Sequence, residues 1–230
     1  MNNDLIKLIN ISKFFKKNKL KVLDNINFTF KKGKTYSLIG PSGSGKSTLL
    51  NILSLIDRPS KGNIIFGKKK INFDNYETND NIRASNIGIV YQDKNLLPDF
   101  TALENIYLSR LTQTNNLDLA IKDSKKMLRK LNLIKRSENY PSELSGGEAQ
   151  RIAISRALIN FPNFIIADEP TGNLDIKNSK EIFKLLLSLK NKDRVIIYAT
   201  HNTYFAKMAD FKLKISDGKI KSYNERIGSK

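Results

Sequence analysis

The chain has 230 residues, of which 40% are hydrophobic and 27% charged, a balance typical of a folded globular protein. It has no cysteine, which excludes disulfides and thiolate metal sites and fits a cytosolic protein. Its length suffices for one large domain, or a domain with a subdomain. No apolar run approaches the roughly 18 residues of a membrane span, and the first residues lack a signal-peptide pattern.

The formal net charge is +18. Lysine is spread along the whole chain, so we expect most lysines on solvated faces and no specific nucleic-acid partner. Weak attraction to an anionic membrane surface stays open, because each nearby lysine adds up to about 1 kcal/mol.

Two alternating segments near the N-terminus predict strands. Residues 5–11 and 22–30 alternate apolar and polar side chains and are separated by a lysine-rich turn. We expect them to form an antiparallel layer beside the main sheet. Phe14 and Phe15 end the first strand, where an aromatic ring could stack on a base; a core or edge position is the alternative for either residue.

A glycine-rich segment lies between an apolar run at 36–39 and a helical pattern at 48–53. It consists of Gly40, Pro41, Ser42, Gly43, Ser44, Gly45, Lys46 and Ser47. This order of strand, loop and helix, with the spacing G-x-x-x-x-G-K-[ST], is the P-loop pattern. Glycines let backbone N–H groups face one point, and the helix start adds its positive dipole end. The pattern predicts a triphosphate site, with Lys46 on the β- and γ-phosphates, Ser47 on Mg²⁺ and Thr48 toward the α-phosphate.

The next segment predicts a hairpin and a buried strand. Residues 63–66 and 71–73 have the composition of hairpin strands, and the polar residues 74–86 are compatible with a helix. Residues 87–91 form an apolar run that ends at Gln92. A glutamine in this position is, by itself, most often a turn residue.

Helical patterns then dominate. Residues 101–104 form a capping box that opens a helix, and residues 117–133 predict a second, amphipathic one in which Leu119, Met127, Leu128 and Leu131 share a face. Ser145 caps a third helix over 149–158, and two glycines expose its N-terminal N–H groups. We expect a helical subdomain, about residues 95–160, inserted in an α/β core.

Two later strands end in polar side chains. Residues 163–167 form a buried strand followed by Asp168 and Glu169, and residues 194–200 form another, followed by His201. Ligands bind at the carboxyl edge of parallel sheets. Asp168 could therefore hold Mg²⁺, Glu169 could orient or deprotonate a water, and His201 could bond a γ-phosphate, although a lone histidine is more often structural.

Turns complete the pattern. Residues 170–175 predict a turn before a helix that extends to Leu189. Residues 211–215 and 219–223 predict a terminal hairpin, with a type I′ turn at Asp217-Gly218.

Taken together, these motifs resemble the nucleotide-binding subunits of ATP-binding cassette (ABC) transporters over essentially the whole chain. Leu144-Ser-Gly-Gly is the signature pattern of that family, and the Asp168-Glu169 strand follows at the family's usual interval. The resemblance implies one domain over 1–230: an α/β P-loop NTPase core with a mostly parallel sheet, an antiparallel β layer and the inserted helical subdomain.

The resemblance also implies roles for single residues. Gln92 is similar to the Q-loop glutamine, which contacts Mg²⁺ and couples to the membrane partner. Phe15 is similar to the A-loop aromatic that stacks on adenine, with Phe14 the weaker candidate. Asp175 belongs to a D-loop, and His201 resembles the switch histidine. ATP and Mg²⁺ are the implied ligands.

Two copies are implied to close head to tail around ATP. Ser145, Gly146, Gly147 and Asp175 would then act on the nucleotide of the partner copy, while Glu169, His201 and Lys46 serve hydrolysis. The chain departs from the family at Glu148, where glutamine is common. A carboxylate suits a helix N-terminus but can repel a nearby γ-phosphate.

Residues 51–59 and 169–175 are similar to the bacterial branch that handles lipoproteins, macrolides and antimicrobial peptides. This implies a cytoplasmic subunit, peripheral on the inner face of the cell membrane, that drives a separate integral membrane subunit to export or extract a lipophilic or peptide substrate. Leu96, Leu97 and Phe100 are candidates for the groove that receives that subunit, with burial in the helical subdomain as the alternative. ATP-driven mechanical signalling without transport, as in cell division, and a soluble cassette in DNA repair, translation or cluster assembly stay as alternative functions. The sequence does not indicate which substrate is transported.

Overall fold

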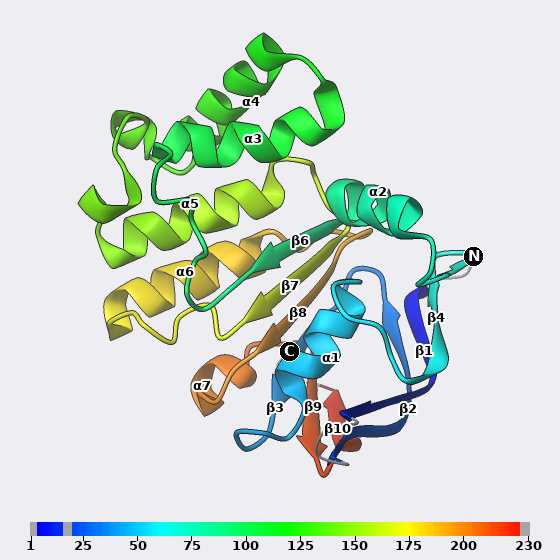
Figure 1. Ribbon diagram of the computed structural model, residues 1–230. Helices are drawn as coiled ribbons and strands as arrows, with labels where there is room; N and C mark the ends of the chain where they lie inside the picture. The colour runs from blue at the N-terminus through cyan, green and yellow to red at the C-terminus, as the bar shows by residue number, and fades with distance from the viewer. Residues whose placement is uncertain (1–3, 16–19, 226–230) are drawn as a thin grey trace. The chain divides into compact units, whose positions relative to one another are not determined.

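The structure is a computed structural model that describes residues 4–15 and 20–225 (Figure 1). The chain divides into two units, the first formed by residues 1–80 and 190–230 and the second by residues 81–189. The predicted lysine-rich turn lies outside the described residues. None of the described helices combines the length and the apolar character needed to cross a bilayer.

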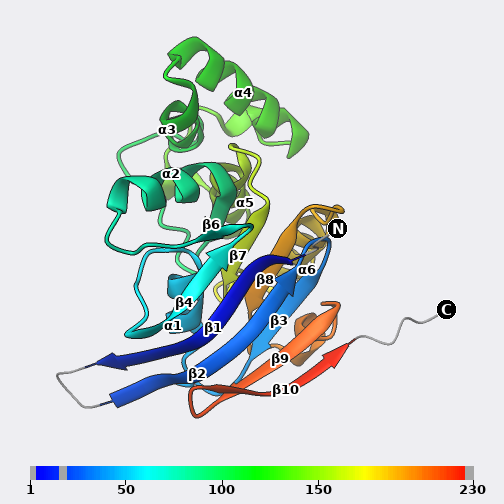
Figure 2. The same cartoon turned by 90° about the vertical axis from the view of Figure 1, so that its right-hand side faces the viewer.

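An antiparallel sheet begins the first unit, in the order β2-β1-β4-β5. Figure 2 shows β2, β1 and β4 side by side. Its strands are β1 (Asp4–Phe15), β2 (Leu20–Lys31), β4 (Lys61–Phe66) and β5 (Lys69–Lys70). This is the predicted antiparallel layer. The predicted hairpin is present as β4 and β5, but the position predicted for its second strand, 71–73, was wrong. The chain turns there: Asp74 N–H donates to the Asn72 side chain, 3.0 Å away, ahead of the next helix.

The first unit also contains a set of mostly parallel strands. Strand β3 (Thr35–Ile39) pairs in parallel with β8 (Val195–Ala199) on one side and β9 (Phe211–Ser216) on the other, and β10 (Lys219–Glu225) pairs antiparallel with β9. Helices α1 (Lys46–Leu53) and α7 (Thr203–Ala206) follow β3 and β8. Asp217 and Gly218 have φ of 51° and 71°, as the predicted type I′ turn requires.

An aromatic cluster forms part of the core of the first unit. Tyr36 is 1% exposed and stacks on Phe211, with ring centroids 5.0 Å apart. Phe30 meets the Tyr36 ring edge-on, also at 5.0 Å. The Tyr36 hydroxyl accepts a hydrogen bond from Lys31 N–H at 2.9 Å. The buried hydroxyl thus has a hydrogen-bond partner. These contacts hold β3 in place where it leads into the glycine-rich loop.

In the second unit, β6 (Ile87–Val90) and β7 (Phe164–Asp168) pair in parallel. Helices gather beside them in Figure 1: α3 (Ala102–Thr114), α4 (Leu117–Lys130), α5 (Gly146–Leu158) and α6 (Ile176–Ser188), with 3₁₀ turns η2 (Ile134–Arg136) and η3 (Pro141–Glu143). Helix α2 (Tyr76–Asn86) connects the first unit to the second along the chain.

Helix α4 follows the predicted apolar face except at Leu119: Leu128 is buried in the apolar cluster of the helical part, and Met127 and Leu131 pack against it. Its buried residues are Ala120, Ser124 and Leu128, whereas Leu119 is 41% exposed. Leu119 therefore does not share the buried face. Leu128 joins an apolar cluster that also contains Ala102, Leu103, Ile106, Leu133, Ile152 and Ile159. This cluster is the core of the helical part.

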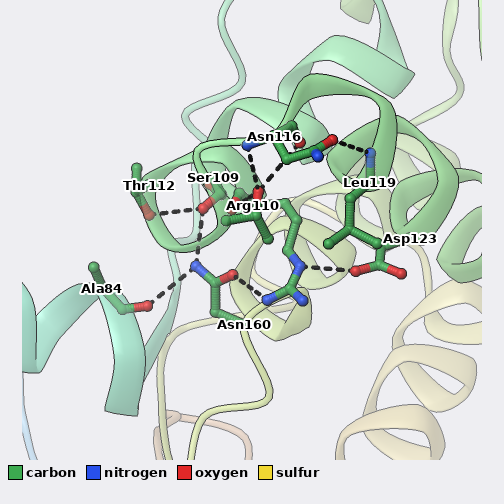
Figure 3. A network of polar contacts seen from close by, with 9 residues as sticks. Ala84, Ser109, Arg110, Thr112, Asn116, Leu119, Asp123 and Asn160 are labelled. Carbon is green, nitrogen blue, oxygen red and sulfur yellow. Dashed lines mark hydrogen bonds and ion pairs between the residues drawn. The ribbon is translucent and has the colours of Figure 1, made fainter.

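A polar network fixes the ends of these helices (Figure 3). Asn160 donates to the carbonyl oxygens of Ala84 and Ser109, at 3.1 and 2.9 Å, and accepts from Arg110 at 3.3 Å. Arg110 also binds Asp123 of α4 at 2.9 Å. One amide side chain thus links the segment after α5 to the end of α2 and to α3.

Candidate nucleotide site

The glycine-rich loop follows β3 and ends where α1 begins. Gly43 and Gly45 have φ of 74° and 101°, in the left-handed region that favours glycine. A Cβ atom on Gly45 would lie 2.8 Å from Val22 O, and one on Gly40 would lie 2.3 Å from Ile215 O. Gly40 and Gly45 are therefore required for space, and Gly43 for its backbone conformation.

The loop is also arranged to receive an anion. Lys46 Nζ donates to Gly40 O and Pro41 O, at 2.8 and 2.9 Å, which holds the ammonium over the loop. Gly45 caps α1 without a side-chain bond, and the first turn contains no acidic residue. The buried Ser44 hydroxyl has no hydrogen-bond partner among the described residues. Main-chain N–H groups, a cation and a spare hydroxyl suit a phosphate chain.

Phe15 and His201 belong to the same unit as the loop. Phe15 ends β1 and is 45% exposed, and Lys13 Nζ lies 5.4 Å from its ring centroid. The Phe14 ring is more buried and lies beside Lys21. His201 is exposed and follows β8 after Thr200. Of the two phenylalanines, Phe15 has the more accessible ring for stacking.

The second unit holds the predicted carboxylates and Gln92. Asp168 is the last residue of β7, and Glu169 follows it with φ of 45°. Gln92 Nε2 donates to the side-chain oxygen of Asn173 at 3.4 Å, and Asn173 donates to Asp93 at 3.1 Å. Within this unit the segment after β6 therefore meets the turn after β7. Asn173 was not among the predicted site residues.

Arg156 of α5 holds the segment that follows Gln92. Its guanidinium donates to Lys94 O at 2.8 Å and to Asn95 O at 2.6 Å. Lys94 and Asn95 both have positive φ, 59° and 48°. Burial lowers the pKa of Arg156 and raises the pKa of Tyr91. The sequence did not predict these contacts, because no local pattern indicates a hydrogen bond between residues about sixty positions apart.

The signature residues cap α5. The Ser145 side chain accepts from Glu148 N–H at 3.3 Å, and the Glu148 carboxylate accepts from Ser145 N–H at 2.9 Å. Arg136 Nε donates to the other oxygen of Glu148 at 2.8 Å. The hydrogen bonds with Ser145 lower the pKa of Glu148 most, and the hydrogen bond from Arg136 lowers it further. Gly146 is exposed and Gly147 buried.

Asp175 caps α6, where its side chain accepts from Asn178 N–H at 2.9 Å, and hydrogen bonds from Asn178 lower its pKa. The three residues considered for a docking groove differ in burial. Leu96 packs against the apolar cluster of the helical part, whereas Leu97 and Phe100 are 43% and 38% exposed.

The predicted Mg²⁺ ligands fit the ion in type. Ser47, Gln92 and Asp168 offer oxygen atoms, which Mg²⁺ prefers, and Mg²⁺ usually takes only one or two protein carboxylates. Among the described residues, no group of three or more His, Cys, Asp or Glu side chains is placed to hold a metal ion. Ser47 belongs to the first unit, and Gln92 and Asp168 belong to the second.

Comparison with known proteins identifies relatives along almost the whole chain. Residues 23–172 match the family model described as ABC transporter. The chain is 43% identical, over 96% of its length and 99% of the relative's, to the lipoprotein-releasing system ATP-binding protein LolD of Rickettsia bellii. It is 46% identical, over 93% of its length and 97% of the relative's, to the LolD protein of Rickettsia conorii.

Solved structures agree with the fold. The chain resembles the ATP-binding cassette MJ0796, in a dimeric post-hydrolysis state bound to ADP and Pi, with TM-score 0.89 and 34% identity over 98% of this chain and 100% of that one. It also resembles cbiO1 of Clostridium perfringens, part of an ABC transporter complex, with TM-score 0.86 and 27% identity over 98% of this chain and 90% of that one. The predicted α/β P-loop fold is confirmed, and the chain belongs to the ABC transporter family as an ATP-binding subunit.

Proposed function

We propose that this chain hydrolyses ATP to drive a membrane complex that releases lipoproteins. The ATPase part is carried by the glycine-rich loop, where Lys46, the first residue of α1, donates to Gly40 O and Pro41 O, and where Gly45 caps the helix without a side-chain bond. The lipoprotein part is supported by the names of relatives that are 43% and 46% identical. The chain itself would lie peripherally on the inner face of the cell membrane, on a separate integral membrane subunit.

Each predicted site residue is assigned the role that its chemistry suits. Lys46 binds the β- and γ-phosphates, and Phe15 stacks on adenine. Ser47, Gln92 and Asp168 are the residues that would hold Mg²⁺. When bound, the ion would neutralise phosphate charge. The backbone of the loop, from Gly40 to Thr48, carries most of the remaining phosphate contacts.

Glu169 is the residue proposed to position the attacking water, and His201 to bond the γ-phosphate or that water. Two copies of the chain would close head to tail, so that Ser145 and Gly147 of one copy contact the nucleotide held by the other, with Gly146 and Asp175 beside them. A cassette described as dimeric and 34% identical supports this assembly. ATP would favour the closed dimer through contacts that disappear with the γ-phosphate.

The first test is the Glu169→Gln variant. Loss of a positioned base slows turnover about 10²–10⁴-fold and leaves ATP binding nearly unchanged, so this variant should accumulate as an ATP-bound dimer. Light scattering after size exclusion, with and without ATP and Mg²⁺, measures the dimer. A monomer at saturating nucleotide would contradict the head-to-tail assembly. Lys46→Ala is the matched control, which should lose nucleotide binding itself.

The second test concerns the cargo. Depletion of the chain in its own cell should leave newly made lipoproteins in the membrane where they are synthesised, and the Glu169→Gln variant should not restore their release. Unchanged lipoprotein distribution after complete depletion would refute the proposed cargo while leaving the ATPase assignment intact.

A further inference from the structure

An ion pair joins Arg136, in the 3₁₀ turn η2, to Glu148 at the start of α5. Glu148 is the third residue of the helix, and its side chain is 18% exposed. One carboxylate oxygen accepts from Ser145 N–H at 2.9 Å, and the other accepts from Arg136 Nε at 2.8 Å. Both oxygens of this carboxylate thus have defined donors.

The arginine is not needed to complete the helix cap. Ser145 and Glu148 already exchange two hydrogen bonds in a capping box, which fixes the first turn of α5. Arg136 binds the oxygen that the capping box does not use. Its added contribution is therefore charge: it places a guanidinium beside a carboxylate that stands within one turn of the helix N-terminus.

We propose that Arg136 is a positioning residue for ATP, which neutralises Glu148 so that the Ser145 helix terminus can accept the γ-phosphate of the partner copy. This inference rests on the proposed function, since it assumes that Ser145 and Gly147 bind phosphate. An unpaired carboxylate would oppose the incoming anion and offset the helix dipole. With Arg136 in place, the pair is close to neutral and keeps the hydrogen bond to Ser145.

The charge-neutralising role predicts a rescue that a structural role does not. In the Glu169→Gln background, Arg136→Ala should raise the ATP concentration for half-maximal dimer formation about three- to tenfold. Glu148→Gln removes the charge and keeps a capping-box side chain, so Arg136→Ala combined with Glu148→Gln should return to within about twofold of the parent. Arg136→Lys keeps the charge and should also stay within about twofold.

Lys135 provides the matched control, because it is an exposed cation next to Arg136 in the same turn. Lys135→Ala should change the half-maximal concentration less than about twofold, as expected for an exposed surface charge. Circular dichroism and thermal unfolding of each variant establish that it is folded. An equal effect of Lys135→Ala and Arg136→Ala would mean that general surface charge, not this pair, matters, and would overturn the proposal.

Two further results would also overturn it: a combined variant as weak as Arg136→Ala, or an Arg136→Ala protein equal to the parent. If the parent itself stays monomeric, the head-to-tail assembly fails, and the role of Arg136 fails with it because that role needs the partner copy. If the parent dimerises, the ATPase of chains with native Glu169 gives a second readout on Arg136: the proposal requires Arg136→Ala to raise KM with little change in kcat, and Glu148→Gln to restore it. A fall in kcat that Glu148→Gln does not restore would refute the proposal.

Discussion

A Cβ atom built on Gly147 would lie 2.4 Å from the side-chain oxygen of Asn178, so α5 and α6 approach closely where each helix begins. Asn178 cannot simply move aside, because its backbone N–H and its side-chain amide both bind Asp175. The close approach thus connects a signature glycine to the cap of the following helix.

Gly147→Ala should therefore displace Asn178 and weaken the cap at Asp175. We expect a loss of about 1–3 kcal/mol in the free energy of unfolding, the usual cost of overpacking, measured by urea denaturation. Gly146→Ala is the control, because its Cβ would meet only a leucine methyl, Leu174 Cδ2, at 3.2 Å. Equal losses in the two variants would show that the contact with Asn178 does not limit the residue at position 147.

Phe15→Ala should weaken ATP binding more than Phe14→Ala does. Stacking of a base on an aromatic ring is worth about 1–3 kcal/mol, which corresponds to roughly a 5- to 150-fold rise in Kd. Phe15 is the ring that β1 leaves 45% exposed. Fluorescent ATP titration measures the two variants, and Phe15→Tyr should retain most of the affinity. A larger loss for Phe14→Ala would reverse the assignment of the A-loop residue.

Features set by neighbouring residues could be predicted from the sequence. The glycine-rich loop, the capping box at Thr101, the helix cap at Ser145, and the turn at Asp217-Gly218 all depend on residues within a few positions of one another. Their backbone conformations follow from local sterics and local hydrogen bonds, so the pattern alone indicates them. The functional roles of the site residues are a separate matter and stay predictions.

Features set by distant residues could not be predicted. Leu119 fits the apolar stripe of α4, but the packing of α4 leaves it exposed. The contact of Arg136 with Glu148 and that of Asn173 with Gln92 join segments that only the tertiary fold brings together. A pattern of single-residue types contains no information on such pairs, which is why Arg136 and Asn173 were absent from the predicted site.

Arg156→Ala should loosen the segment after Gln92. The substitution leaves Lys94 O and Asn95 O without their guanidinium donor, in a stretch where both residues have positive φ. Hydrogen bonds from a charged donor contribute about 1.5–3 kcal/mol each in favourable cases, so we expect a loss of about 2 kcal/mol in unfolding free energy and faster hydrogen exchange at residues 92–96.

The control for Arg156 is Arg151→Ala on the same helix. Arg151 forms an ion pair with Glu181, which is about half exposed, so its loss should cost less than about 1 kcal/mol. Arg156→Lys keeps the charge but has a single donor nitrogen. Its loss of unfolding free energy should therefore lie between those of Arg156→Ala and Arg151→Ala. Unchanged exchange at residues 92–96 in Arg156→Ala would show that other contacts hold this segment.

The first unit should lose stability in acid when the Asp210 carboxylate becomes protonated. Burial alone would raise its pKa, but hydrogen bonds from Lys190 at 2.7 Å and from Thr35 N–H at 2.7 Å outweigh burial and lower the pKa below its usual value. A carboxylate with a lowered pKa in the folded state stabilises the protein above its unfolded pKa of about 3.9. That contribution disappears as the pH falls through the folded pKa.

The Asp210→Asn variant should separate this contribution from general acid denaturation. At pH 7 it should be about 1–2 kcal/mol less stable than the parent, because the amide keeps an acceptor for Thr35 but loses the charge opposite Lys190. Once the pH falls below the lowered folded pKa of Asp210, the two proteins should converge, since both then have a neutral side chain at position 210. Asp193→Asn, an exposed carboxylate in the same unit, should leave the curve nearly unchanged. Parallel pH–stability curves for the parent and Asp210→Asn would show that Asp210 keeps its ordinary pKa in the folded protein.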